Sequence, residues 1–321
     1  MIKKLVLIST IFISLFANSN FVDIYRERGI KAVEDLLSKE LEKKDYWLES
    51  IKDRDLSFGF YENLQYLLFC DKNEKKFTLY EYKDNSFIEI SNIYAYTGLL
   101  GDKFKEGDLK TPVGVYSLRY KKSKVDEFYG PLALVTSYPN VFDRVQGKDG
   151  HGIWIHGLPY KSERPDNTKG CIALDNEYLT NLDKIIDIKK SILLTTEDGY
   201  TFDANREDFA TILADLYRWK RAWSESDIDT YLSFYDKSFI RYDKLKYSDF
   251  SKYKRKIFSK KERKRIIFKN INISPYPAKD NKKLFRVSFF EDYSTNSYKF
   301  KGEKELYLEL KNSKIYILSE K

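Results

Sequence analysis

The 321-residue chain contains only two cysteines and two histidines. Two cysteines cannot form a disulfide framework or a four-cysteine zinc site, and two histidines cannot form a histidine-rich metal site. The sequence therefore predicts neither a bound metal nor another cofactor. With 14 Gly and 7 Pro, the chain is not a collagen-like or proline-rich filament. Its 42% hydrophobic content excludes a disordered chain, and its length allows about two domains.

The one long apolar run lies near the start of the chain and is short for a membrane-spanning helix. Residues 5–17 are uncharged and follow Lys3 and Lys4, whereas a spanning helix needs about 20 apolar residues. Small residues at Ala17 and Ser19 complete the pattern of a secretory signal peptide over residues 1–19. An uncleaved membrane anchor is the alternative. In both cases we expect the rest of the chain to be exported.

Charge divides the remaining chain into two parts. Residues 20–200 carry 27 basic and 31 acidic side chains, whereas residues 201–321 carry 28 basic and 18 acidic side chains. This difference indicates two units with different surfaces. Residues 56–199 contain short β-rich runs and one clear helix from Asn176, which predicts a mainly β domain. Residues 200–321 predict helices followed by long antiparallel strands, an α+β domain.

A short helical segment precedes both units. In residues 20–55, apolar side chains recur at helical spacing, for example at Ile30, Val33 and Leu37. Such a stripe must pack on its own chain or on a second copy, and the second arrangement would make a homodimer.

Three of the four cysteines and histidines fall close together, at His151, His156 and Cys171. A cysteine nucleophile needs a nearby base, because the thiolate attacks and an ordinary thiol is mostly protonated at neutral pH. Gly170 would let the backbone beside Cys171 approach a substrate, and backbone N–H groups there could hold an oxyanion. The alternative is a buried small cysteine and a structural histidine. Cys70 lies in an apolar run, and we expect it in the core.

The surrounding motifs favour the catalytic interpretation. They are Thr97-Gly98, then Gly107-Asp108 followed by Thr111-Pro112-Val-Gly114-Val-Tyr116, and finally His156-Gly157 followed by Thr168-Lys169-Gly170-Cys171. Over residues 64–197 this order resembles the L,D-transpeptidase catalytic-domain (YkuD-type) family. The resemblance implies a β sandwich-like or barrel-like fold that acts on peptidoglycan stem peptides. It makes Cys171 the nucleophile, His156 the base and His151 a residue beside the cleft. A backbone carbonyl, for which Gly170 is the candidate, would orient His156.

One departure from the family points to a branch of it. Transpeptidases of this family usually carry Arg two residues after the cysteine, where this chain has Ala173. Residues 219–235 also resemble the opening helices of NTF2-like domains. Together these features resemble the cell-shape-determining periplasmic L,D-carboxypeptidases, which trim tetrapeptide stems to tripeptides. An L,D-transpeptidase and a non-catalytic cell-wall-binding protein are the alternatives.

Further residues are candidates for substrate binding. Three cations near the motifs are candidates to hold a substrate carboxylate, although a solvated surface charge is the more common role for any one of them: Lys110, Arg164 and Lys169. Trp154 and Tyr116 either line the cleft or belong to the core. Thr168 and Ala173 flank the nucleophile.

A basic run in the C-terminal domain has no counterpart in the motifs. It begins at Lys252, ends at Arg265 and holds nine basic residues and one Glu. Such a run is a solvated face or a site for a polyanion. Because export argues against nucleic acid, we expect any partner there to be an anionic polymer or surface of the cell envelope.

Overall fold

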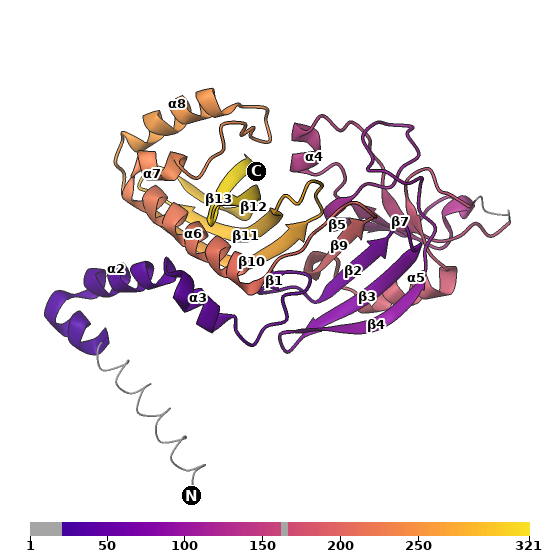
Figure 1. The fold of residues 1–321 in the computed structure, drawn as a ribbon, viewed down its shortest axis with the longest axis horizontal. Helices are drawn as coiled ribbons and strands as arrows, with labels where there is room; N and C mark the ends of the chain where they lie inside the picture. The colour runs from indigo at the N-terminus through magenta and orange to yellow at the C-terminus, as the bar shows by residue number, and fades with distance from the viewer. Residues whose placement is uncertain (1–20, 162–165) are drawn as a thin grey trace, which may run out of the picture.

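The computed structural model describes residues 21–161 and 166–321. Two β-sheets lie side by side, each with helices of its own, and the N-terminal helices extend from one end (Figure 1). The predicted signal peptide and the candidate Arg164 lie outside the described residues. In the described part of the chain, no helix combines the length and apolar character needed to cross a membrane.

The first sheet has eight strands in the order β4-β3-β2-β9-β5-β6-β7-β8. Their bounds are β2 Tyr66–Asp71, β3 Lys76–Lys83, β4 Ser86–Tyr94, β5 Gly114–Lys122, β6 Ala133–Thr136, β7 Trp154–His156, β8 Ile172–Ala173 and β9 Ser191–Thr196. Asp175 caps the N-terminus of helix α5 (Asn176–Ile185), because its carboxylate accepts two backbone N–H groups. The helix packs Leu179 and Leu182 on this sheet. The short elements are α4 (Val141–Val145), η1 (Glu127–Tyr129) and η2 (Ile188–Lys190). The predicted mainly β domain is confirmed.

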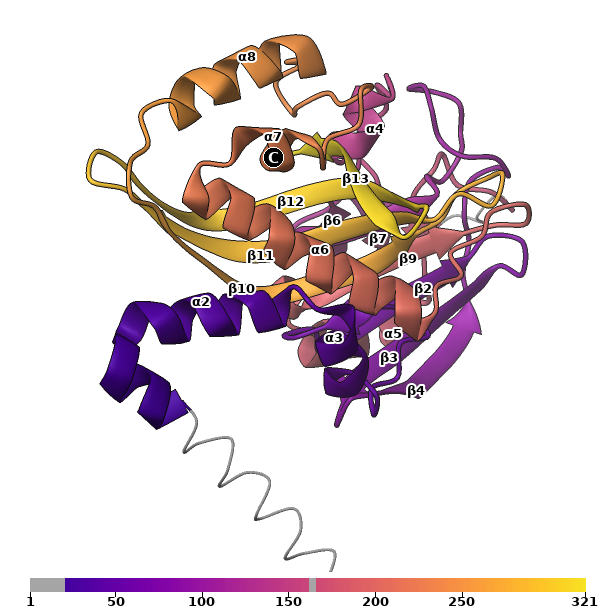
Figure 2. The ribbon, with the colours of Figure 1, turned by 60° about the vertical axis from the view of Figure 1, so that its left-hand side comes forward.

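The second sheet forms the C-terminal domain. Its order is β1-β10-β11-β12-β13, with bounds β1 Phe60–Tyr61, β10 Arg265–Tyr276, β11 Leu284–Ser294, β12 Lys299–Lys311 and β13 Lys314–Glu320. Three helices accompany it, namely α6 (Arg206–Glu225), α7 (Ile228–Leu232) and α8 (Tyr247–Phe258). Helix α6 begins with a capping box at Asn205 and lies against the five-stranded sheet (Figure 2). It buries Phe209 and Trp219 in the core of this domain. The predicted α+β domain is confirmed.

The two sheets are joined by a strand and by an aromatic cluster. Strand β1 precedes the eight-stranded sheet in sequence but pairs with β10, with Phe60 opposite Ile273. At the same boundary, Phe142 of α4 stacks on Tyr307 at 5.3 Å and meets Tyr276 edge-on at 5.6 Å. The domains therefore share a buried interface.

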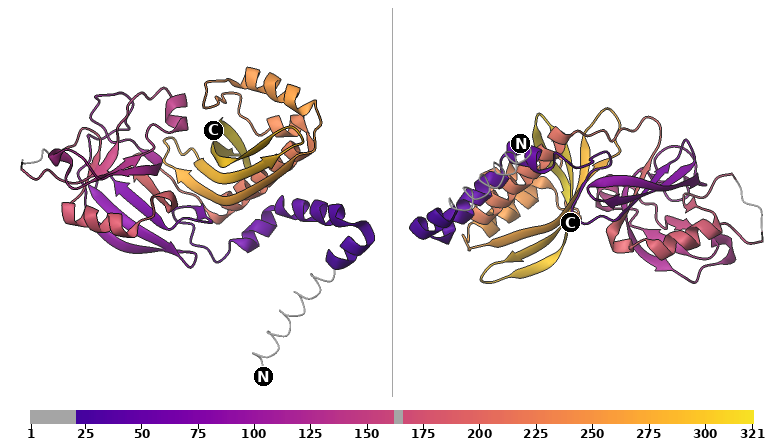
Figure 3. Two further views of the ribbon diagram at one scale, coloured as in Figure 1. Left: turned by 180° about the vertical axis from the view of Figure 1, so that it is seen from behind. Right: turned by 90° about the horizontal axis from the view of Figure 1, so that it is seen from below.

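The N-terminal helices α2 (Ile30–Leu41) and α3 (Lys44–Ser50) lie along the C-terminal domain (Figure 3). Trp47 of α3 stacks on Tyr217 of α6 at 5.5 Å and anchors the segment. Helix α2 has no buried residue, and Ile30 and Leu37 stay exposed.

Candidate active site

His156 ends strand β7 and is almost completely buried. Its Nδ1 lies 2.7 Å from the carbonyl oxygen of Gly157. Because a carbonyl oxygen only accepts, Nδ1 carries the proton in the neutral ring, and Nε2 is left as the basic nitrogen. The edge of the ring meets Tyr129 at 5.0 Å, which fixes its plane. The orienting carbonyl is therefore that of Gly157, and the candidate Gly170 is wrong in this role.

Cys171 lies immediately before β8, which runs parallel to β7. The pairing sets Ile172 opposite Ile155 and Ala173 opposite His156. The sulfur accepts the backbone N–H of Trp154 at 3.4 Å and approaches the Gly152 carbonyl oxygen at 3.5 Å. Cys171 is partly exposed, so adjacent strands bring a reachable thiol and a buried imidazole to one end of the sheet.

The turn before the nucleophile depends on Thr168 and Gly170. The Thr168 hydroxyl donates to the Cys171 carbonyl at 2.5 Å and accepts the Gly170 N–H at 3.0 Å. This Gly170 N–H is therefore engaged and does not point at a substrate oxyanion. Gly170 has φ +119°, and a Cβ there would lie 2.6 Å from the Lys110 carbonyl oxygen. Only glycine fits this conformation and this close approach.

Residues 97–113, which we call the cap segment, pack against this turn. The Thr97 carbonyl accepts the Thr168 N–H at 2.8 Å, and the Gly98 N–H donates to the Thr111 hydroxyl at 2.8 Å. The Thr97-Gly98 and Thr111-Pro112 motifs are thus brought together beside Gly170.

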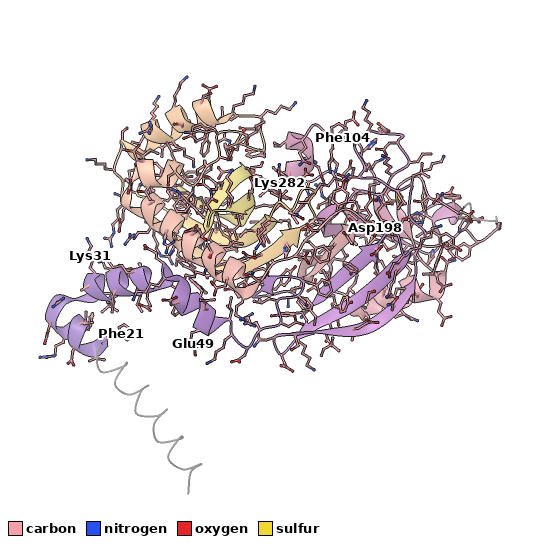
Figure 4. The ribbon with its side chains drawn as sticks, viewed as in Figure 1. Phe21, Lys31, Glu49, Phe104, Asp198 and Lys282 are labelled. Atoms are coloured by element: carbon pink, nitrogen blue, oxygen red, sulfur yellow. The ribbon has the colours of Figure 1, made fainter. Side chains whose placement is uncertain are left out.

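Two buried lysines, Lys72 and Lys148, hold the cap segment on the domain, and a third, Lys103, forms its ion pair within the segment. Lys72 pairs with Glu197 at 2.5 Å and donates to the Gly101 carbonyl at 2.7 Å. The other two pairs are Lys103 with Asp108 at 2.7 Å and Lys148 with Asp102 at 2.6 Å. Figure 4 marks this region with Phe104, next to Lys103, and with Asp198, next to Glu197. Ammonium groups rarely lie this deep without carboxylate partners, so these pairs define the position of the segment.

The other candidates divide between the cleft and the core. Trp154 is partly exposed beside Cys171, with the Lys122 ammonium 4.4 Å from its ring centre. Tyr116 is fully buried and donates to the Val113 carbonyl at 3.2 Å, so the cleft-lining interpretation is wrong and the core alternative holds. Ala173 is also fully buried, and its backbone pairs with Tyr96.

The charged candidates lie at the surface of the site. Lys110 is half-buried with its carbonyl against Gly170, and Lys169 is exposed. His151 lies exposed on the loop before β7, and its Nδ1 is 3.6 Å from Glu106 Oε1. Cys70 is fully buried, and burial raises the pKa of its thiol to about 12, so it is an inert core residue.

Sequence reasoning missed two contributors to the site. Tyr129, which packs on His156, lies in no motif, and nothing in the sequence distinguishes it from 25 other tyrosines. Asn176 donates to the Leu158 carbonyl at 3.0 Å and accepts its N–H at 2.7 Å, which fixes the chain just after Gly157. The sequence predicts a helix that starts at Asn176, and this position was the signal that could have identified the residue.

The structure splits the basic run between two elements. Residues up to Phe258 belong to α8, and Arg265 begins β10. Burial lowers the pKa of Lys254 on α8 to about 8, and its ammonium lies over the rings of Trp223, Tyr231 and Phe250. The last three basic residues line a groove of about 940 Å³ between α2 and the C-terminal domain, together with Lys220: Arg263, Lys264 and Arg265.

Within the described residues, no group of three or more His, Cys, Asp or Glu side chains is arranged to hold a metal ion.

Comparison with known proteins agrees with this geometry. Residues 65–193 match the L,D-transpeptidase catalytic domain (YkuD), and residues 211–321 match the Cds6 C-terminal NTF2-like domain. The structure of the helical cell shape determining protein Pgp2 from Campylobacter jejuni is 44% identical, with a TM-score of 0.81 over 87% of this chain and 99% of that chain. Bd1075 from Bdellovibrio bacteriovorus is 25% identical, with a TM-score of 0.64 over 83% of this chain and 95% of that chain.

A curated relative matches the catalytic part alone. The L,D-transpeptidase-type protein YafK of Escherichia coli (strain K12) is 30% identical over 113 residues. The match spans 35% of this chain and 43% of the relative, less than half of either protein.

Proposed function

Because the chain belongs to the L,D-transpeptidase (YkuD) family and ends in a Cds6-type NTF2-like domain, we propose that it is a cysteine L,D-carboxypeptidase of the periplasm. It would trim tetrapeptide stems of peptidoglycan to tripeptides and so contribute to cell shape. The observation that carries the proposal is the buried His156, oriented by the Gly157 carbonyl, on the strand next to Cys171.

The proposed reaction uses these groups in two steps. His156 Nε2 takes the thiol proton, and the Cys171 sulfur attacks the carbonyl carbon of the third residue of the stem, which is bonded to the amide nitrogen of the D-alanine. The C–N bond breaks, and the imidazolium gives its proton to the amine of the leaving D-alanine. A water, deprotonated by His156, then attacks the thioester. This releases the tripeptide and returns the thiol.

Ala173 supports hydrolysis over transpeptidation. In a transpeptidase, a second stem must be held so that its amine replaces the water, and a cation two residues after the nucleophile would serve that purpose. Here the position is a buried methyl group in a paired strand. The exposed Lys169 and half-buried Lys110 are then the proposed contacts for the terminal carboxylate of the substrate.

Incubation of the purified protein with tetrapeptide muropeptides tests the proposal. We expect tripeptides and an equal amount of free D-alanine, and no product from Cys171→Ala. Cross-linked dimers would identify an L,D-transpeptidase instead. Absence of any turnover, with Cys171→Ala supporting normal shape in cells, would favour the non-catalytic cell-wall-binding alternative.

The basic groove of the C-terminal domain suits an anionic partner. Lys220 lies over the rings of Tyr217 and Phe268, and burial lowers its pKa. We propose that an anionic polymer of the envelope binds along Lys220, Arg263 and Lys264. Co-sedimentation with polyphosphate should fall with added salt and in the triple alanine variant. Binding that is unchanged in that variant would contradict the assignment.

The exposed face of α2 suits a second copy of the chain. Its apolar residues Ile30, Leu36 and Leu37 are exposed, and we propose that they form a homodimer contact. Light scattering should give a dimer for the native chain and a monomer for Leu36→Glu/Leu37→Glu. A native monomer would contradict this proposal.

A further inference from the structure

A tyrosine of the C-terminal domain is built into the core that supports the cap segment. Tyr276 lies at the end of β10, and its ring packs on Phe142 of α4 in the other domain. Its hydroxyl accepts the Asn140 amide N–H at 3.1 Å and donates to Asp143 Oδ1 at 3.4 Å. Burial, reinforced by the charge of Asp143, raises the pKa of Tyr276 well above its usual value, so the hydroxyl keeps its proton.

Asp143 is held in one geometry by its neighbours. It forms a capping box with Asn140, in which each side chain accepts the backbone N–H of the other residue at 2.9–3.0 Å. Its side chain has no exposed surface, and Oδ1 lies 2.8 Å from the Lys148 ammonium. A carboxylate buried this deeply needs each of its donors, because a lost partner is not replaced by water.

Lys148 carries the contact onward to the cap segment. Its ammonium, 4% exposed, also lies 2.6 Å from Asp102 Oδ2. The other carboxylate oxygen of Asp102 accepts the Val113 N–H at 2.9 Å. This bond joins Asp102 to the last residue of the cap segment, three residues after Lys110, whose carbonyl packs against Gly170. Hydrogen bonds thus run from Tyr276 through Asp143, Lys148 and Asp102 to the Val113 N–H, and the nearby Lys110 carbonyl packs against Gly170 in the turn before the nucleophile.

We propose that Tyr276 is a positioning residue of the active site, contributed by the C-terminal domain. It holds Asp143 and Lys148 so that the cap segment keeps Gly170 and Cys171 in register with His156. The NTF2-like domain is then part of the catalytic unit as well as a candidate binding module. The inference rests on the proposed function for its turnover readout alone.

The matched pair of variants is Tyr276→Phe and Tyr307→Phe in the full exported chain. Tyr307 lies in the same interface and its ring meets that of Tyr276 edge-on at 5.7 Å, but its hydroxyl donates to Glu305 on its own strand. In Tyr276→Phe we expect the rate of hydrogen exchange in residues 97–113 to rise at least threefold, while the exchange rates in β11 and β12 stay unchanged. Turnover should fall about tenfold in kcat with KM within twofold, and alkylation of Cys171 should change in rate. Tyr307→Phe should leave all three measurements near those of the native chain.

Equal behaviour of the two variants would overturn the inference. If Tyr276→Phe does not fold, Asp102→Asn provides the second test, because an amide still accepts the Val113 N–H but loses the charge that faces Lys148. Unchanged exchange in the cap segment of Asp102→Asn would overturn the proposal. Hydrogen exchange and alkylation need no substrate, so failure of the proposed activity would be seen separately from failure of this inference.

Discussion

Replacing Lys72 by methionine tests whether a buried ion pair holds the cap segment. The ammonium is fully buried between the Glu197 carboxylate and the Gly101 carbonyl. Methionine fills most of the volume but removes the ammonium that faces the Glu197 carboxylate. The Gly101 N–H still donates to that carboxylate. Removing one partner of a buried pair costs about 3–5 kcal/mol in the free energy of unfolding, because the other charge stays buried without compensation.

The assay is urea unfolding of the variants, followed by circular dichroism. A matched control is Lys121→Met, which breaks a 2.7 Å pair with Asp183 whose lysine is 38% exposed. That exposed pair should contribute about 0–1 kcal/mol. Glu197→Gln removes the second charge, so the double variant with Lys72→Met should recover about 2 kcal/mol relative to additivity.

The reasoning is refuted if Lys72→Met loses no more stability than Lys121→Met. It is also refuted if Glu197→Gln and Lys72→Met are additive, because the cost would then come from packing and not from an uncompensated charge. Hydrogen exchange in residues 97–113 locates the effect, which should be largest near Gly101.

Three more predictions follow from the site. Gly170→Ala should lower the rate of D-alanine release more than tenfold, because its Cβ would meet the Lys110 carbonyl. Gly147→Ala, also at a positive φ but with the Phe104 ring 4.0 Å from the added Cβ, should retain activity. Iodoacetamide should modify Cys171 alone in the folded protein and Cys70 after denaturation, since Cys70 is buried with a pKa of about 12; native labelling of both thiols, seen by mass spectrometry, would contradict this. Although burial opposes it, hydrogen bonds from the Lys103 ammonium and three backbone N–H groups lower the pKa of Asp108 to about 2 from 3.8. The folded pKa lies below the unfolded one, so this stabilisation is present above about pH 4 and lost toward pH 2. Asp108→Asn should therefore be less stable than the native chain at pH 7, and the free energies of unfolding of the two proteins should converge as acid unfolding approaches pH 2.

Local patterns in the sequence contain no signal for the strand order, but the motifs identify residues that lie close together in the folded domain. Cys171 and His156 could be found because nucleophile and base types are rare in this chain and sit in spaced motifs. Tyr116 shows the limit of a motif: its residue type and spacing are those of the family, yet its side chain serves the core. The Gly157 carbonyl could not be distinguished from that of Gly170, because every residue has a carbonyl and only the folded path selects one.

Long-range pairing explains what else sequence reasoning missed. Lys72 and Lys148 look like ordinary surface lysines in the sequence, since a lysine is buried only when carboxylates from other parts of the chain meet it. Their partners include Glu197, which is more than a hundred residues from Lys72. Local patterns predicted helices such as α5 and α6 because their caps and apolar stripes are contained within a few turns.

Strand β1 has a consequence for how the protein reaches its native state. Phe60 and Tyr61 lie ahead of the catalytic sheet in sequence but pair with β10, and Tyr61 donates to Ser274, 213 residues further on. If the chain is exported as proposed, its first half crosses the membrane before the partner strand β10 arrives. Closing so long a loop slows folding and leaves this aromatic segment open to envelope proteases until the last sheet forms. A chain truncated before residue 265 would have lost the partner strand of β1, and we expect it to be degraded in the cell envelope.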